Sequence, residues 1–259
     1  QFWYHTRLIP KLGWLEYLII TPAQHRVHHA INDIYLDKNL GEIFQWWDRM
    51  FGTFQEELDD VPCVYGIKRA PRTWNPIKIN FQHLWLLMQD AWRTNSWWDK
   101  LRLWFMPTGW RPADVVEKYP IEVIEDPYSY DKYAPQLSTK LQAWTWFQFI
   151  LTNIFFLHML VGFTEIGFPQ LFFYGGFIFL HIYAYSTLMD LDKNAIWFEM
   201  VKSVFGLAII YQLGGWFTAS AATSLATPLM IVYLIGTVVI VAGFVMTELQ
   251  QAERNFTTA

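Results

Sequence analysis

The sequence predicts an all-α integral membrane protein, in which a histidine-rich cap precedes about four C-terminal transmembrane helices. Composition is the first observation: of 259 residues 53% are hydrophobic, 19% are aromatic and only 16% are charged, which is too apolar for an ordinary soluble domain. Long apolar segments after Leu141 are the second. The net charge of −4 does not point to a class of partner, and no basic run suggests nucleic acid.

The first twenty residues are apolar but broken by Pro10 and Gly13. We expect a membrane-embedded or interfacial helix that ends near Pro10, and then a short helix over Leu12–Ile20. The chain begins without Met inside an aromatic stretch, so we expect it to be the C-terminal part of a longer protein. Thr21-Pro22 is a helix-start signal, with Thr21 as N-cap and Pro22 in the first helical position.

A histidine cluster follows this helix start. His25, His28 and His29 form a His-x-x-His-His box, and His5 lies one short segment upstream. Residues i, i+3 and i+4 share one face of a helix, so the three rings of the box can converge. Neutral imidazole is the commonest protein ligand for iron, zinc, copper and nickel. The cluster therefore predicts a metal site, whereas a lone histidine would indicate packing or a surface role.

The middle of the chain is less regular. Asn32–Gly41 reads as a polar loop, Glu42–Met50 as a helix, Val64–Lys68 as a short strand and 107–135 as irregular. Phe81–Phe105 predicts one or two amphipathic helices at the level of the lipid headgroups, because basic residues accompany its tryptophans. Those tryptophans are Trp85, Trp92, Trp97, Trp98 and Trp104. We expect three regions, with boundaries 1–60, 61–140 and 141–259.

Four apolar segments of about 20 residues, the length that spans a bilayer, complete the chain. They are Ala143–Phe163, Phe168–Met189, Ile196–Phe217 and Leu225–Met246. The first and third connections between them contain no Lys or Arg, whereas Lys140 and Lys193 lie at the opposite ends. The positive-inside rule then predicts that the histidine stretch and the C-terminus face the cytoplasm. We expect His158 and His181, inside the spans, to make interhelical hydrogen bonds.

The motifs of the first half resemble the sterol desaturase and fatty acid hydroxylase superfamily, and most closely its alkylglycerol monooxygenase branch. They are HRVHH (25–29), YLDKN (35–39) and WDRMFGTF (47–54), supported by FWYHT (2–6), VYGI (64–67), NPIK (75–78) and FQHL (81–84). The resemblance implies a membrane non-haem di-iron oxygenase with two Fe ions held by histidine. It implies that His25, His28 and His29 are the final ligand box and that His5 is a further ligand. The other two histidine boxes of the family would precede Gln1.

Each ligating histidine needs a partner for its second ring nitrogen. The candidates are Asp37, Asn39 and Asp48, and Asn32 lies one turn beyond His28. A polar turn around Asp37 and a helix-surface ion pair of Asp48 are the alternatives. His83 lies in a matching stretch and is a further candidate, although a structural role is the commoner one for a lone histidine. We expect no catalytic side chain beyond the metal ligands.

The reaction that the resemblance implies is hydroxylation of a lipid C–H bond with O₂. In the alkylglycerol branch the hydroxylated carbon adjoins an ether oxygen, and the product collapses to an aldehyde and a glycerol. That branch takes electrons from a tetrahydropterin and other members from a cytochrome or ferredoxin, so the electron donor stays open. The membrane would be the bacterial inner membrane or the endoplasmic reticulum.

Three other functions stay open. The first is desaturation or hydroxylation of a sterol, a fatty acyl chain or a carotenoid by the same chemistry. The second is a zinc hydrolase, although HRVHH lacks the glutamate that such enzymes use as general base. The third is a non-catalytic membrane subunit that retains a partial histidine box. Metal content separates the last two from an oxygenase.

Overall fold

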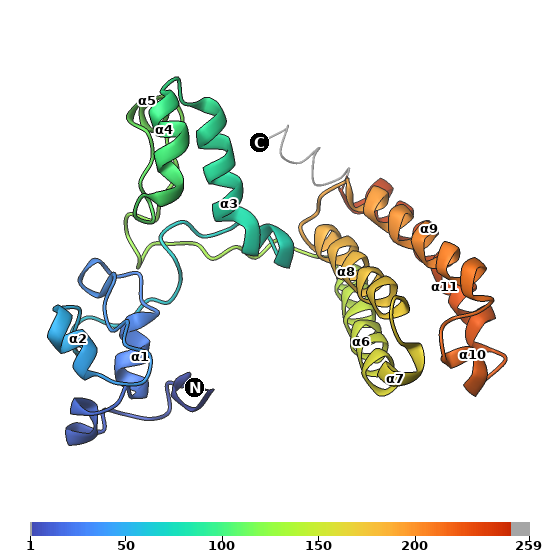
Figure 1. The fold of residues 1–259 in the computed structure, drawn as a ribbon, viewed down its shortest axis with the longest axis horizontal. Coiled ribbons are helices and arrows are strands. Elements are labelled where there is room, and N and C mark those ends of the chain that lie inside the picture. Colours follow the sequence, from blue (N-terminus) through green and yellow to red (C-terminus); the bar gives the residue numbers. More distant parts are fainter. Residues whose placement is uncertain (1, 250–259) are drawn as a thin grey trace. The chain divides into compact units, whose positions relative to one another are not determined.

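A computed structural model of the chain describes residues 2–249 (Figure 1). Over these residues the structure contains helices and two isolated β-bridges, and no strand longer than a bridge. The chain divides into two compact units. Residues up to Ala70 together with Gln89–Lys132 make the first, and Pro71–Met88 with the chain from Tyr133 onward makes the second.

The histidine-bearing part of the first unit is built from short helices joined by ordered loops. The helix expected over Leu12–Ile20 is a 3₁₀ helix of five residues, and the helix expected from Glu42 begins only at Trp46. Glu42 has a φ of 55°, which an α-helix does not accept. The expected strand at Val64–Lys68 is reduced to one bridge, between Ala30 and Tyr65. The elements are η1 (Phe2–Tyr4), η2 (Gly13–Tyr17), α1 (Pro22–His28), η3 (Asp33–Tyr35) and α2 (Trp46–Phe51).

A small core holds α1 against the following loops. Val27 and Tyr35 are fully buried and pack with Ala30. The Tyr35 hydroxyl donates to the carbonyl of Val61 at 2.8 Å and accepts from the amide of Leu58 at 3.0 Å. The loop after α2 is therefore fixed beside the helix that carries the histidine box.

The predicted amphipathic stretch forms α3 (Pro76–Arg93), α4 (Trp97–Arg102) and η4 (Leu103–Phe105). Its tryptophans stay accessible, and Trp92 and Trp97 are 87% and 80% exposed. The segment expected to be irregular contains one further helix, α5 (Ala113–Lys118). In the first unit, Arg111 donates to both carboxylate oxygens of the buried Asp90, at 2.6 and 2.8 Å.

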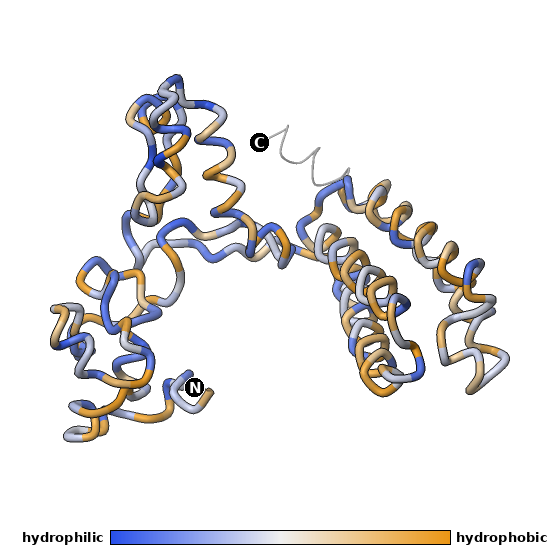
Figure 2. Tube along the Cα trace, viewed as in Figure 1, coloured by the Kyte–Doolittle hydropathy of each residue, from blue (hydrophilic) through white to orange (hydrophobic). Residues whose placement is uncertain are grey.

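The second unit contains the four predicted spans as long helices (Figure 1). Hydrophobic residues dominate all four (Figure 2). Their ends lie within a few residues of the predicted ones, and α9 stops at Leu213 because Gly214 turns into the left-handed region with a φ of 72°. The elements are α6 (Thr139–Val161), α7 (Phe163–Ile166), α8 (Gln170–Met189), α9 (Ala195–Leu213), α10 (Ala219–Ala222), α11 (Ala226–Phe244) and η5 (Val245–Leu249). The chain is an integral membrane protein by the length and composition of these helices.

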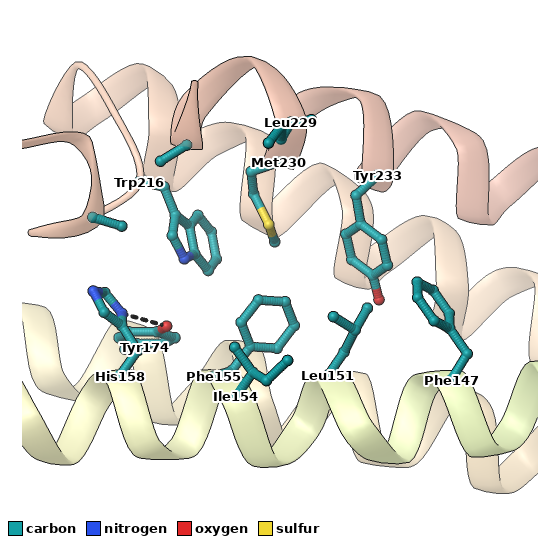
Figure 3. A pocket seen from close by; sticks show the side chains of 12 residues that line it. Phe147, Leu151, Ile154, Phe155, His158, Tyr174, Trp216, Leu229, Met230 and Tyr233 are labelled. Atoms are coloured by element: carbon teal, nitrogen blue, oxygen red, sulfur yellow. Dashed lines mark hydrogen bonds between the residues drawn. The ribbon is translucent and has the colours of Figure 1, made fainter. Parts of the chain in front are cut away.

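Both histidines of the spans make the expected interhelical hydrogen bonds. His158 Nδ1 lies 2.8 Å from the Tyr174 hydroxyl, and His181 Nε2 lies 3.1 Å from the carbonyl of Gln148. His158 stands at one end of an apolar cavity of about 390 Å³, which α6 and α11 line together with Trp216 (Figure 3). Tyr233 points into the same cavity from α11 (Figure 3).

Candidate metal centre

Helix α1 begins where the sequence predicts, and buried hydrogen bonds hold its first turn. Thr21 is the N-cap and Pro22 is the first helical residue. Gln24 accepts from the Thr21 amide at 3.2 Å and donates to the carbonyl of Glu16 at 2.8 Å. Glu16 in turn accepts from the Thr21 hydroxyl at 3.0 Å. These buried contacts set the direction of a helix of only seven residues, which could not hold its shape alone.

Three histidine side chains meet at one point. His25 Nε2 lies 2.8 Å from His5 Nε2 and 2.9 Å from His29 Nε2. All three candidate ligand atoms lie within 4.8 Å of one another. His5 comes from the segment after η1, whereas His25 and His29 come from the last turns of α1 and its C-cap.

His28 lies beside this group but points its ring differently. Its ring centre is 5.6 Å from that of His25 and 5.2 Å from that of His29. The His28 Nδ1 atom has a long contact of 3.4 Å with the carbonyl of Lys38. A main-chain carbonyl of the YLDKN loop, rather than a side chain, therefore faces the second ring nitrogen of His28.

The local environment keeps the rings of His25 and His29 neutral. Partial burial, and then the proximity of His29, His5 and His28, lower the pKa of His25 to about 3. Partial burial also lowers the pKa of His29. Tyr4, which is buried, packs its ring 4.2 Å from that of His25. Neutral imidazoles have free nitrogen lone pairs at pH 7, as metal coordination requires.

The spacing of the nitrogens fits a shared ion. Histidine nitrogens bind metals such as zinc at about 2.0–2.1 Å, so two of them at a right angle would be about 3 Å apart. The two measured separations, 2.8 and 2.9 Å, match that value. An all-imidazole donor set suits iron, zinc, copper or nickel. These residues therefore fit a metal ion, although they do not by themselves choose which one.

Three of the candidates for holding the histidines make other contacts. Asn32 donates to the carbonyl of Pro62 and the hydroxyl of Tyr128, and it accepts from Val64. Asn39 donates to the carbonyls of Gln24 and Gln55. Asp48 accepts from the amides of Leu40 and Gly41 and from the Thr53 hydroxyl. Asn39 reaches the box indirectly, since Gln24 immediately precedes His25.

The remaining two candidates lie at exposed positions. Asp37 sits at the tip of the YLDKN loop with a φ of 55°, a conformation that aspartate accepts more readily than most residues. His83 is exposed on α3, in the part of that helix that belongs to the second unit. A role for either residue at the metal stays a prediction.

Sequence reasoning missed Tyr4 and an ion pair beside the box. Arg26, the second residue of HRVHH, makes three hydrogen bonds of 2.6 to 3.1 Å to the carboxylate of Glu57. A charged side chain inside the histidine box was the available signal. Its partner lies 31 residues away, which no local pattern reveals.

Comparison with known proteins supports the resemblance. The profile of the fatty acid hydroxylase family matches residues 1–53. Alkylglycerol monooxygenases of Xenopus tropicalis and Homo sapiens are each 31% identical to the chain, over 80% and 83% of it and over 46% and 47% of their own lengths. The enzyme of Danio rerio is 30% identical over 92% of the chain and 52% of its own length. No solved structure matches.

The matched relatives extend well beyond this chain, which spans about half of their length. The family match covers the histidine site, whereas the relatives also align with much of the remaining chain. The two findings agree with the motifs of the first half of the chain. Together the family match and these relatives support placing the chain in the sterol desaturase and fatty acid hydroxylase superfamily, near its alkylglycerol monooxygenase branch.

Proposed function

We propose that this chain supplies the final histidine ligands of a membrane oxygenase that hydroxylates a lipid C–H bond. The observation that carries the proposal is the convergence of His5, His25 and His29 at a spacing that fits a metal. The similarity to alkylglycerol monooxygenases favours an ether lipid of glycerol as the substrate class. It favours this reaction over the zinc hydrolase and over the non-catalytic subunit.

The metal of the proposal is iron, as a pair of non-haem ions. His5, His25, His28 and His29 would be its ligands from this chain, and the remaining ligands would come from elsewhere in the protein. Bound iron would activate O₂ and supply the oxidising power for the C–H bond. The electron donor of the proposal is a tetrahydropterin, in keeping with the alkylglycerol monooxygenase branch.

The residues of the chain have defined tasks in this proposal. The imidazoles of His25 and His29 present neutral nitrogens, since their pKa values are lowered. Tyr4 packs on His25 and limits the rotation of its ring. The carbonyl of Lys38 faces His28 Nδ1, which leaves Nε2 of that ring for coordination. The capping contacts of Gln24 hold the whole box at the start of a helix.

The proposed topology places the histidine segment and the C-terminus on the cytoplasmic side. Its support is the distribution of Lys and Arg between the connections of the four spans. A lipid substrate would then be taken from the bilayer itself. The region boundaries 1–60, 61–140 and 141–259 stay part of the proposal.

The test is the metal content of the purified full-length protein, with His25→Ala and His29→Ala beside the wild type. About two irons per chain, lost in both variants, together with O₂-dependent conversion of an alkylglycerol, would support the proposal. Bound zinc instead of iron would favour the hydrolase. A freshly prepared wild type without metal would overturn the proposal and leave a membrane subunit without this chemistry.

A further inference from the structure

His5 is the one converging histidine that lies outside α1 and its C-cap. It follows the 3₁₀ turn η1, and the backbone from His5 to Leu12 forms neither helix nor strand. Tyr4 is buried on the N-terminal side of His5, but no residue from His5 to Leu12 is buried and Leu8 is 92% exposed, so burial does little to hold the segment after His5. A segment of this kind needs specific contacts to keep a side chain within 3 Å of His25.

Arg26 provides two such contacts. Its Nη1 atom donates to the carbonyl of Thr6 at 3.2 Å and to that of Ile9 at 2.9 Å. Thr6 is the residue directly after His5. One guanidinium therefore ties the segment at two points to the helix that carries His25 and His29.

Glu57 fixes the guanidinium itself. Both of its carboxylate oxygens accept from Arg26, with Nη2 at 2.6 Å and Nε at 2.9 and 3.1 Å. The side chains are only 13% and 19% exposed, so solvent screens the pair weakly. With Nε and Nη2 engaged by the carboxylate, Nη1 is aimed at the two carbonyls. This division of donors uses the planar fork of arginine, which lysine lacks.

We propose that Arg26 and Glu57 form a clamp that positions His5 for metal binding, an inference that rests on the proposed function. Neither residue touches the histidine rings in this role. The clamp acts through the backbone at Thr6 and Ile9, so its loss would affect the contribution of His5 and leave α1 in place. Residues that orient a metal ligand without binding the metal typically change metal affinity by about 10–100-fold, and we expect a change of this size when the clamp is lost.

The key variant is Glu57→Gln, with Glu56→Gln as its matched control. Glu56 is the neighbouring acidic residue and pairs with Lys11 at 3.4 Å, but it is 59% exposed and does not contact Arg26. Affinity for Fe²⁺ and for Co²⁺ as a spectroscopic probe is measured on the full-length protein. We expect Glu57→Gln to weaken binding at least tenfold and to change the Co²⁺ spectrum, and Glu56→Gln to match the wild type. Arg26→Lys should behave as Glu57→Gln.

A double-mutant cycle separates positioning from a general structural effect. Once His5→Ala has removed the ligand, Glu57→Gln should weaken metal binding no further, because the clamp has nothing left to position. Additive losses would overturn the inference. So would a Glu57→Gln protein that binds metal as tightly as the wild type.

Hydrogen–deuterium exchange of the peptide over residues 2–12 tests the clamp without metal. Faster exchange in Glu57→Gln than in Glu56→Gln supports the clamp even if the wild type binds no metal, in which case only the proposed function fails. Exchange in Glu57→Gln as slow as in the wild type overturns the clamp. The two hypotheses therefore fail by different observations.

Discussion

The Nε2 atoms of His5 and His25 lie 2.8 Å apart, although twenty residues separate them in the chain. His25 and His29 are brought together by one helical turn, a purely local effect. His5 precedes η2 and α1 in the chain and reaches the other two histidines only through tertiary folding. The candidate metal centre thus combines one local and one tertiary contribution.

Removal of His5, the ligand that tertiary folding brings to the site, is the most direct test of this arrangement. We expect His5→Ala to lower metal affinity by more than the roughly 10–100-fold that an outer partner costs. Leu8→Ala, on the same segment and 92% exposed, is the control and should bind metal normally. Equal metal affinity of His5→Ala and Leu8→Ala would remove His5 from the ligand set.

Asp48 is expected to stabilise the fold around the YLDKN loop. Its carboxylate is 1% exposed and accepts from the Leu40 and Gly41 amides and the Thr53 hydroxyl. Asp48→Ala should lower the free energy of unfolding by roughly 2–4 kcal/mol, since three donors lose their acceptor. Thermal and denaturant unfolding would measure it.

The control for Asp48 is Asp59→Ala. The Asp59 side chain is 93% exposed and forms only a surface ion pair with Lys11. Its loss should cost no more than about 0.5 kcal/mol. A similar stability of the two variants would contradict the role given to Asp48.

Within the spans, Lys202 and Glu199 form a buried ion pair on α9, with side chains 1% and 6% exposed. Lys202 also donates to Thr237 on α11 at 3.3 Å. Lys202→Met would leave the carboxylate buried without a partner, at a cost of about 3–5 kcal/mol. The double variant Lys202→Met/Glu199→Gln should recover much of this loss, because no uncompensated charge remains. Unfolding in detergent measures both, and a double variant as unstable as Lys202→Met would refute this account.

Cys63, the single cysteine, is expected to react slowly in the folded protein. Burial, followed by the nearby Glu57, raises the pKa of its thiol to about 12. Because the thiolate is the reactive form, iodoacetamide at pH 8 should label the folded chain two to three orders of magnitude more slowly than the denatured chain, about tenfold for each pKa unit. Glu57→Gln should speed the labelling. Equal rates for folded and denatured chains would contradict the shift.

The raised pKa of the Cys63 thiol also makes the free energy of unfolding depend on pH. The folded thiol has the higher pKa, so its contribution is fully present below the unfolded value near 9 and is lost as the pH rises towards 12. Cys63→Ala should therefore unfold with a weaker dependence on pH between these values. Denaturant unfolding at pH 8 and pH 10 compares the two proteins.

Features with a strong local cause were predictable. The capped start at Thr21-Pro22 was one, because its two residue types satisfy the first turn of a helix. The four spans were another, because a bilayer sets the length of an apolar helix. The helix expected from Glu42 was wrong at its start, since a positive φ at that residue is decided by the surrounding loop.

The sequence by itself determined the membrane class, the four spans and the identity of the histidine box, because hydrophobicity and helical spacing act over neighbouring residues. Only the tertiary structure decided which groups face the box. The carbonyl of Lys38 lies beside His28 Nδ1, whereas the side chains of Asn32 and Asp48 accept hydrogen bonds from loop backbone amides. Tertiary folding also brought Glu57 to Arg26 across 31 residues. Hydrogen-bond partners depend on how distant loops pack, and spacing along the chain does not record that packing.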